Sequence, residues 1–354
     1  MRHRFLASIG VVAAVIAAVV LTAVPVAGQS QKTTAAAKAA PSKPVARAAW
    51  TPPRTPWGDP DLQGIWPATH MIGVPFERPQ QFAGRTDLTD EELAQREAQA
   101  RRQADQDNEE FIAPRAGADG QGAGGTGPPS HWGERGKPQR QTSLIVEPAD
   151  GRMPPMTPDG QRRATRVPTS NNPGPFDGPE DFSLYDRCIT RGVLGGILPV
   201  PYNNGNQIVQ GPGYVAFRYE MVHETRIIPL DGRAHVGDSI RTFMGDARGH
   251  WEGNTLVVET TNFNGRTGIT GNGRNTPYTR DARVVERFTR VAEDTVQYEV
   301  TIDDPKTWTR SWKIAFPLIH DPSYQIFEYA CHEGNNAMRN MLSGARADEK
   351  AAGR

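Results

Sequence analysis

Four segments with the alternation of β-strands each carry one ionisable residue on an otherwise apolar face. Side chains alternate between the two faces of a strand, so residues two apart share a face. The ionisable residues are His223, Glu286, Arg310 and Glu328. If these faces point inward, the groups must pair or bind a ligand, because unpaired buried charge is costly. A histidine with two glutamates in an aromatic cavity suits general acid–base catalysis, which makes His223, Glu286 and Glu328 the candidate catalytic residues.

The same faces carry candidate ligand-binding residues. Tyr219 shares the face of His223, and Trp308 and Trp312 share the face of Arg310. We expect Tyr219, Trp308, Arg310 and Trp312 to line one cavity.

Two other interpretations of this pattern stay open. A slip of one residue in strand phase would move all of these side chains to the outer face. An ion pair between Glu286 and Arg310 inside the sheet would be structural rather than catalytic.

Two histidines outside these faces are further candidates for ligand binding. His250 lies in residues 246–252, a run of Asp, Arg, His and Glu that we expect at a hairpin tip, although such a tip is also an ordinary solvated turn. His332 follows Cys331 and is expected at the mouth of the cavity. A metal held by His332 with His223 or His250 is an alternative that the spacing does not enforce. The sequence predicts no metal and no cofactor.

Several function classes are excluded by missing signatures. The chain has no G-x-S-x-G, H-E-x-x-H or C-x-x-C-H motif and no Walker loop. The glycine-rich residues 117–127 lack the preceding strand and following helix of a dinucleotide loop. Lys plus Arg and Asp plus Glu each number 40, with no basic cluster, so we expect no nucleic-acid partner.

The N-terminus has the pattern of an export signal. A basic start is followed by an apolar run over residues 5–21 and by small residues for cleavage near Ala27 and Gly28. We therefore expect a signal peptide over residues 1–28, a periplasmic or secreted protein, and no membrane span after cleavage. A retained membrane anchor is the alternative.

The chain has two cysteines, Cys188 and Cys331. In an oxidising compartment two lone cysteines usually pair, so we expect a disulfide, with two buried free thiols as the alternative.

The domain organisation follows from composition. Residues 29–49 are polar and alanine-rich and predict a disordered linker. Residues 50–180 are a proline- and glycine-rich arm with one surface helix at about residues 87–107, begun by a capping box of Thr89 and Glu92. The tryptophans of residues 50–66 are expected to dock on the following domain. Residues 181–345 form that domain, and residues 346–354 are a polar tail.

Short strands separated by turn residues fill residues 206–333. They predict a mainly β fold: an antiparallel lipocalin-like barrel or a strongly curved sheet, with one or two short helices. A small barrel holds either side chains or one ligand. The leading prediction is therefore a protein that binds a small hydrophobic or amphipathic ligand. The alternatives are an acid–base hydrolase or lyase using His223 with Glu286 or Glu328, and a structural or interaction module of the cell envelope. The sequence predicts no oligomeric state.

Three motifs carry a resemblance to a known family. They are WGDPDLQGIW at residues 57–66, GHWEGNTLVVETTNF at residues 249–263 and YACHEGN at residues 329–335. With these motifs the chain resembles a family of exported bacterial proteins, common in acidobacteria and other environmental bacteria, that has no assigned activity. The resemblance implies export and a shared fold, and it assigns no catalytic residue.

Overall fold

The computed structural model describes residues 50–107, 133–165, 175–269 and 276–353. The predicted signal peptide, the predicted linker and the glycine-rich residues 117–127 lie outside these ranges. Among the described residues the fold is mainly β, with two larger antiparallel sheets and few helices, as the sequence predicts.

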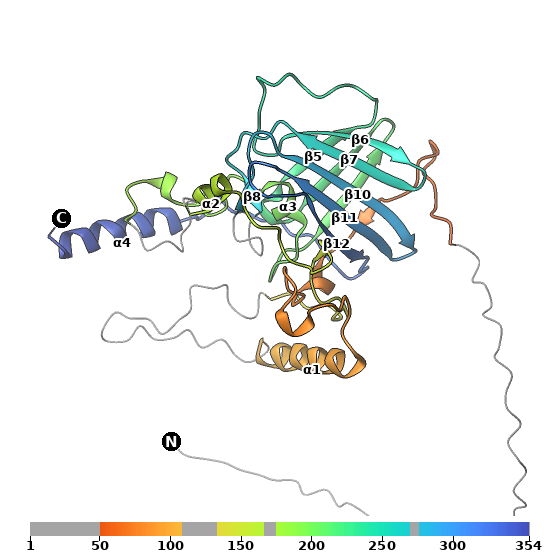
Figure 1. The fold of residues 1–354 in the computed structure, drawn as a ribbon, viewed down its shortest axis with the longest axis horizontal. Coiled ribbons are helices and arrows are strands. Elements are labelled where there is room, and N and C mark those ends of the chain that lie inside the picture. The colour runs from red at the N-terminus through yellow and green to blue at the C-terminus, as the bar shows by residue number, and fades with distance from the viewer. Residues whose placement is uncertain (1–49, 108–132, 166–174, 270–275, 354) are drawn as a thin grey trace, which may run out of the picture. The chain divides into compact units, whose positions relative to one another are not determined.

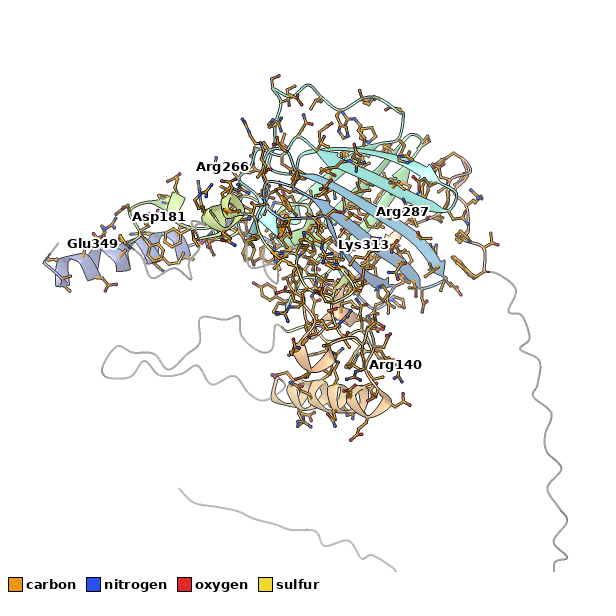
Figure 2. All side chains as sticks on the ribbon, viewed as in Figure 1. Arg140, Asp181, Arg266, Arg287, Lys313 and Glu349 are labelled. Carbon is orange, nitrogen blue, oxygen red and sulfur yellow. A yellow bond between two sulfur atoms is a disulfide. The ribbon has the colours of Figure 1, made fainter. Side chains whose placement is uncertain are left out.

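The larger sheet has six strands in the order β2-β12-β11-β10-β7-β6. The strands are β2 (Ile145–Glu147), β6 (Asp246–Glu252), β7 (Thr255–Thr261), β10 (Arg283–Ala292), β11 (Thr295–Asp303) and β12 (Trp312–Ile319). Figure 1 shows β7, β10, β11 and β12 side by side, and each neighbouring pair is antiparallel. Polar side chains such as Arg287 and Lys313, labelled in Figure 2, lie on the less buried face of β10 and β12.

The second sheet has four strands in the order β1-β3-β4-β5. They are β1 (Gly64–Ile65), β3 (Asn206–Gly211), β4 (Tyr214–Tyr219) and β5 (Thr225–Pro229). A separate pair joins β8 (Gly268–Ile269) to β9 (Thr276–Pro277). Strand β5 contacts β6, but the two are not paired by hydrogen bonds. The paired strands of the described residues therefore form open sheets and do not close a barrel.

Aromatic rings fill the core between the sheets. Phe217 on β4 meets Phe288 on β10 with ring centroids 4.6 Å apart, and Phe288 meets Tyr298 on β11 at 4.9 Å. Tyr298 then meets Phe316 on β12 at 5.2 Å. The inward residues of β10, β11 and β12 alternate with outward polar residues, which is the pattern that the sequence analysis used. Burial of these rings supplies a large part of the stabilisation of the fold.

The described residues contain four helices and four 3-10 turns. Helix α1 (Asp90–Asp107) occupies the predicted position, and Thr89 and Glu92 form the predicted capping box. The other helices are α2 (Pro158–Ala164), α3 (Gly192–Ile197) and α4 (Ala337–Ala351), with 3-10 turns η1 (Thr69–Met71), η2 (Gln80–Phe82), η4 (Pro179–Asp181) and η5 (Met221–His223). Helix α4 takes in most of the predicted polar tail. No helix within the described ranges has the length and apolar character to cross a bilayer.

The tryptophan-rich arm docks through only one of its three tryptophans. Trp66 is buried, and its backbone N–H donates to the carbonyl of Asn206 at 2.8 Å. The pairing of β1 with β3 continues this contact. Trp50 and Trp57 stay partly exposed.

The sequence analysis was wrong about a continuous strand through His223. Strand β4 ends at Tyr219, and β5 begins at Thr225 after the η5 turn. Val222 and His223 have φ values of 60° and 45°, in the left-handed region that a strand cannot contain. The turn shifts the alternation of inward and outward side chains by one residue. Arg226 on β5 therefore points into the core, and His223 does not.

Three other segments also differ from the prediction. Residues 239–245 and 324–333 were expected as strands and have no regular structure. Residues 246–252 are strand β6 rather than a hairpin tip, and the tip is the following Gly253-Asn254 turn.

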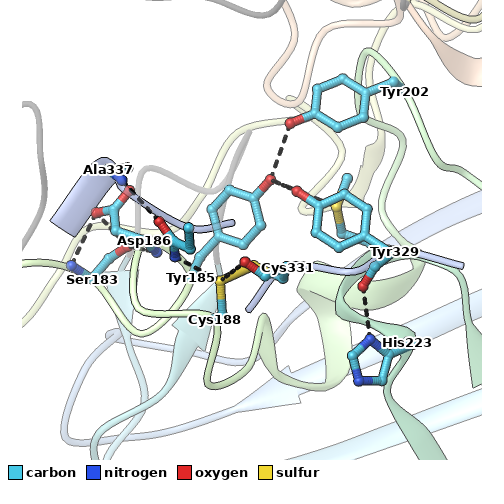
Figure 3. The surroundings of a disulfide bond; sticks show 11 residues. Ser183, Tyr185, Asp186, Cys188, Tyr202, His223, Tyr329, Cys331 and Ala337 are labelled. Carbon is cyan, nitrogen blue, oxygen red and sulfur yellow. Dashed lines mark hydrogen bonds between the residues drawn. A yellow bond between two sulfur atoms is a disulfide. The ribbon is translucent and has the colours of Figure 1, made fainter. Parts of the chain in front are cut away.

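The predicted disulfide between Cys188 and Cys331 is present, with 5.6 Å between the Cα atoms. Figure 3 shows its surroundings. The bond fastens the irregular C-terminal segment, residues 320–336, to the residues before α3.

Candidate functional site

The predicted site residues separate into a buried group and an exposed group. Tyr219, Glu286, Trp308 and Trp312 have at most 1% of their surface exposed. Glu286 lies inward on β10, as the alternation predicts. Its partner is Arg226, with 2.8 Å between Nη2 and Oε2, and not the predicted Arg310.

The buried ion pair sits in a hydrogen-bonded cluster. The hydroxyl of Tyr298 donates to Glu286 Oε1 at 3.2 Å, and Arg226 donates to Tyr219 at 2.8 Å and to Thr260 at 3.1 Å. Burial raises the pKa of Tyr219 to about 12, so its hydroxyl stays neutral. These contacts satisfy a charged pair that no solvent reaches, which is the arrangement of a structural ion pair.

Three buried donors in the same core lack a hydrogen-bond partner within the described residues. They are the indole N–H groups of Trp308 and Trp312 and the hydroxyl of Tyr278. The indole rings of Trp308 and Trp312 meet with centroids 5.3 Å apart. Buried polar groups are nearly always satisfied, so these donors are exceptions among the polar groups of the core.

The remaining predicted residues are on the surface. His223, His250, Arg310, Glu328 and His332 are exposed. His223 Nδ1 lies 2.8 Å from the backbone carbonyl of Tyr329, and His250 Nε2 lies 3.2 Å from Glu252. The structure therefore does not bring His223 and Glu328 together with the buried Glu286. Arg310 and Glu328 are exposed because neither lies on a strand, so the predicted inward faces do not exist there.

A pocket of about 680 Å³ opens beside the C-terminal segment. We call it the carboxylate pocket. Its lining residues come from three distant parts of the chain: Glu134, Tyr202, Asn203, Glu220, Asp321, Ser323, Tyr324, Gln325 and Phe327.

Glu220 is buried and anchors one side of this pocket. It directly follows β4, and its carboxylate accepts hydrogen bonds from the backbone N–H groups of Gly205 and Phe327, each at 3.0 Å. The side-chain amide of Asn203 donates to the same carboxylate at 3.1 Å. One carboxylate thus joins the turn before β3 to the C-terminal segment.

Glu134 lines the same pocket and is only partly exposed. Its carboxylate accepts from the backbone N–H of Asn203 at 2.5 Å and from the side-chain amide of Asn204 at 2.9 Å. Burial raises the pKa of Glu134, and these hydrogen bonds only partly oppose the effect.

Tyr324 connects the two glutamates. Its hydroxyl oxygen lies 2.6 Å from Glu220 Oε2 and 3.0 Å from Glu134 Oε1. Burial and the hydrogen bond to Glu220 raise the pKa of Tyr324, so its hydroxyl keeps its proton.

Aromatic rings form the apolar part of the pocket. The side chain of Phe327 is 66% exposed, although it is large and apolar. Tyr202 reaches from the pocket to a cluster in which the hydroxyl of Tyr185 lies 3.2 Å from Tyr202 and 2.9 Å from Tyr329. Figure 3 shows the Tyr185 hydroxyl between the two others, close to the disulfide. The cluster holds the Tyr202 ring in place.

Left-handed backbone occurs at one residue that lines this pocket and at two that follow a lining residue. Among the described residues, the non-glycine residues with positive φ are Cys188, Asn203, Val222, His223 and Asn262. Asn203 lines the pocket, and the two turn residues follow Glu220 closely in sequence. Such conformations are costly and gather at sites where the surrounding contacts impose them.

The described residues contain no group of three His, Cys, Asp or Glu side chains arranged to hold a metal ion. No family model, curated protein or solved structure matches this chain.

The sequence analysis missed Glu134, Glu220 and Tyr324 as a set. Glu220 lies one residue beyond Tyr219, on the face that a continuous strand would turn to solvent. The sequence signal for this set is the turn-forming run Asn203-Asn204-Gly205, because the polar groups of such a turn need hydrogen-bond partners.

Proposed function

We propose that this chain is an exported ligand-binding protein whose carboxylate pocket takes an amphipathic organic cation. The observation that carries the proposal is the composition of the pocket wall. Three carboxyl groups and three aromatic rings line it, and none of its described lining residues is basic.

Charge favours a cation over an anion. Asp321 is the most accessible of the three acids, and two hydrogen bonds from Ser323 hold its pKa below the ordinary value. Asp321 is therefore ionised at neutral pH. A negatively charged pocket wall attracts a cation and repels an anion through the same electrostatic interaction.

The aromatic rings favour an organic ligand over a bare metal ion. Phe327, Tyr202 and Tyr324 line the pocket. A cation bound over an aromatic ring gains about 0.5–2 kcal/mol. Exposed apolar surface of this kind is also used for ligands with an apolar part. An alkylammonium group with a short apolar chain satisfies both requirements.

Isothermal titration calorimetry tests this proposal with a matched pair of probes. We expect choline to bind roughly tenfold more tightly than its uncharged isostere dimethylbutanol, since about 1.4 kcal/mol corresponds to a factor of ten. An anionic alkyl sulfate should not bind. Equal binding of choline and the isostere would contradict a cation site.

Matched variants connect the binding to the pocket. Asp321→Asn and Phe327→Ala should each weaken choline binding severalfold. Asp238→Asn and Ile227→Ala are the controls, because Asp238 and Ile227 are exposed and lie outside the pocket. Equal losses in the control variants would contradict the assignment.

Export and family membership belong to the same proposal. The basic start, apolar run and small residues of positions 1–28 support a cleaved signal peptide. The motifs at residues 57–66, 249–263 and 329–335 support the resemblance to a family of exported bacterial proteins. N-terminal sequencing of the mature protein should begin near residue 28, and an intact N-terminus in the cytoplasm would contradict export.

A lipocalin-like interior site is the second candidate function. It is supported by the unpartnered donors of Trp308, Trp312 and Tyr278, which an acceptor-bearing apolar molecule would satisfy. Native mass spectrometry of the protein from its own envelope should then show a retained small molecule. Only the unliganded mass, under conditions that preserve the fold, would count against this candidate.

A further inference from the structure

The hydrogen bonds of the carboxylate pocket require one more proton than its ionised side chains supply. A tyrosine hydroxyl has one proton to donate, and an ionised carboxylate can only accept. Tyr324 nevertheless lies within hydrogen-bond distance of both Glu220 and Glu134. If both glutamates were ionised, the Tyr324 hydroxyl could donate to only one of them. Its oxygen lone pair would then face the negatively charged oxygen of the other.

A proton on Glu134 resolves this conflict. Glu134 then donates to the Tyr324 oxygen, and Tyr324 donates to Glu220 over the shorter contact of 2.6 Å. Burial raises the pKa of Glu134, which supports this assignment. Each glutamate accepts three further hydrogen bonds from its surroundings. The shorter contact of Tyr324 therefore selects Glu220 as the acceptor of its proton.

We propose that the carboxylate pocket is a proton-exchanging cation site, in which the free protein carries one proton shared among Glu134, Tyr324 and Glu220 and a bound organic cation expels it. This inference rests on the proposed function, because it concerns the same pocket and ligand class. The exchange is balanced in charge: one cation enters, one proton leaves to the buffer, and no covalent bond to the ligand forms.

The groups around the glutamates are consistent with one shared proton. Tyr324 faces Glu134 from the C-terminal segment, and Asp321 adds a second negative charge to the same wall. Tyr202 lines the pocket without a charge. Arg135 donates to the backbone carbonyl of Glu134 at 2.9 Å.

The exchange fixes the sign of the pH dependence. Since binding releases a proton, the affinity for the cation rises as pH rises while Glu134 is protonated in the free protein. The rise is about tenfold per pH unit and stops once Glu134 is ionised without ligand. A site with two permanently ionised glutamates would show a flat profile.

Calorimetry of choline binding in buffers with different ionisation enthalpies measures the released protons directly. We expect about one proton per bound choline for the unaltered protein. Glu134→Gln keeps a donor facing Tyr324 but cannot release it, so this variant should bind more weakly and release no proton. Glu333→Gln is the control, because Glu333 is exposed and lies outside the pocket lining.

Carbon NMR of labelled glutamate side chains gives a readout that needs no ligand. The carboxyl resonance that disappears in Glu134→Gln should have the shift of a protonated acid at neutral pH. An ionised Glu134 there, or choline binding without proton release, would overturn the exchange and leave the cation site standing. Failure of every cation to bind would instead overturn the proposed function.

Discussion

Arg226 Nη2 lies 2.8 Å from Glu286 Oε2 in the centre of the core, and both side chains are almost completely buried. The pair links β5 of the four-stranded sheet to β10 of the six-stranded sheet. A charged contact therefore fixes how the two sheets face each other.

Removal of one member of this pair should be strongly destabilising. Glu286→Leu leaves the guanidinium of Arg226 buried without its counter-charge, and breaking such pairs costs about 3–5 kcal/mol. The double substitution of Arg226→Met with Glu286→Leu should recover much of this loss, because neither charge remains. Urea unfolding measures both, and a double variant less stable than Glu286→Leu would contradict the argument.

The disulfide should stabilise the fold chiefly through the unfolded chain. Cys188 and Cys331 are 143 residues apart, and a loop of that length corresponds to about 5 kcal/mol in the chain-entropy model. We expect Cys188→Ser with Cys331→Ser to lower the midpoint of thermal unfolding clearly. The same variant should weaken choline binding, because the segment that carries Tyr324 and Phe327 loses its anchor. An unchanged midpoint would show that the bond closes a loop already ordered in the unfolded state.

Gly205 is predicted to tolerate no side chain. A Cβ atom there would lie 2.7 Å from Glu220 Oε2 and 2.8 Å from atoms of Tyr324 and Ile326. Gly205→Ala should therefore displace the glutamate–tyrosine contact, cost about 1–3 kcal/mol and weaken cation binding. Gly237→Ala is the matched control, since a Cβ there meets no atom within 4 Å. Equal effects of the two substitutions would contradict a steric cause.

Helix α1 should lose its N-terminal cap in acid. The hydrogen bond from Arg85, followed by that from the Thr89 backbone, lowers the pKa of Glu92 from 4.5 to about 2. A pKa lowered by folding stabilises the helix above the ordinary value, and this stabilisation is lost as pH falls toward about 2. Hydrogen exchange at residues 90–93 should accelerate over that interval, and Glu92→Gln should abolish the pH dependence. An unchanged acceleration in the variant would assign it to another group.

The alternation of apolar and polar residues correctly predicted which side chains are buried where a strand is paired on both sides. It placed Glu286 and Trp312 inside because β10 and β12 form regular ladders with β11. The alternation gave a wrong prediction at Val222, because this left-handed residue separates β4 from β5. A valine gives no sequence signal for a left-handed conformation. The alternation also failed for residues 324–333, which alternate like a strand but have no neighbouring strand to bond.

The carboxylate pocket was beyond prediction for a different reason. Glu134 follows a long glycine-rich stretch and meets Asn203 and Tyr324, which are 69 and 190 residues away in sequence. Contacts at such separations depend on how the sheets place three loops, and no local periodicity encodes that placement. The capping box of α1 was predictable because its two residues are neighbours on the helix.

The scaffold and the site come from different parts of the chain. In the described residues, every strand and every member of the hydrophobic core precedes His320. Five of the nine residues that line the carboxylate pocket lie at positions 321–327. A chain that stops after His320 would keep every strand of the described residues and would lose this part of the pocket together with the disulfide. On the proposed function, another segment of similar length, joined by the same disulfide, would give the same two sheets a pocket of different chemistry.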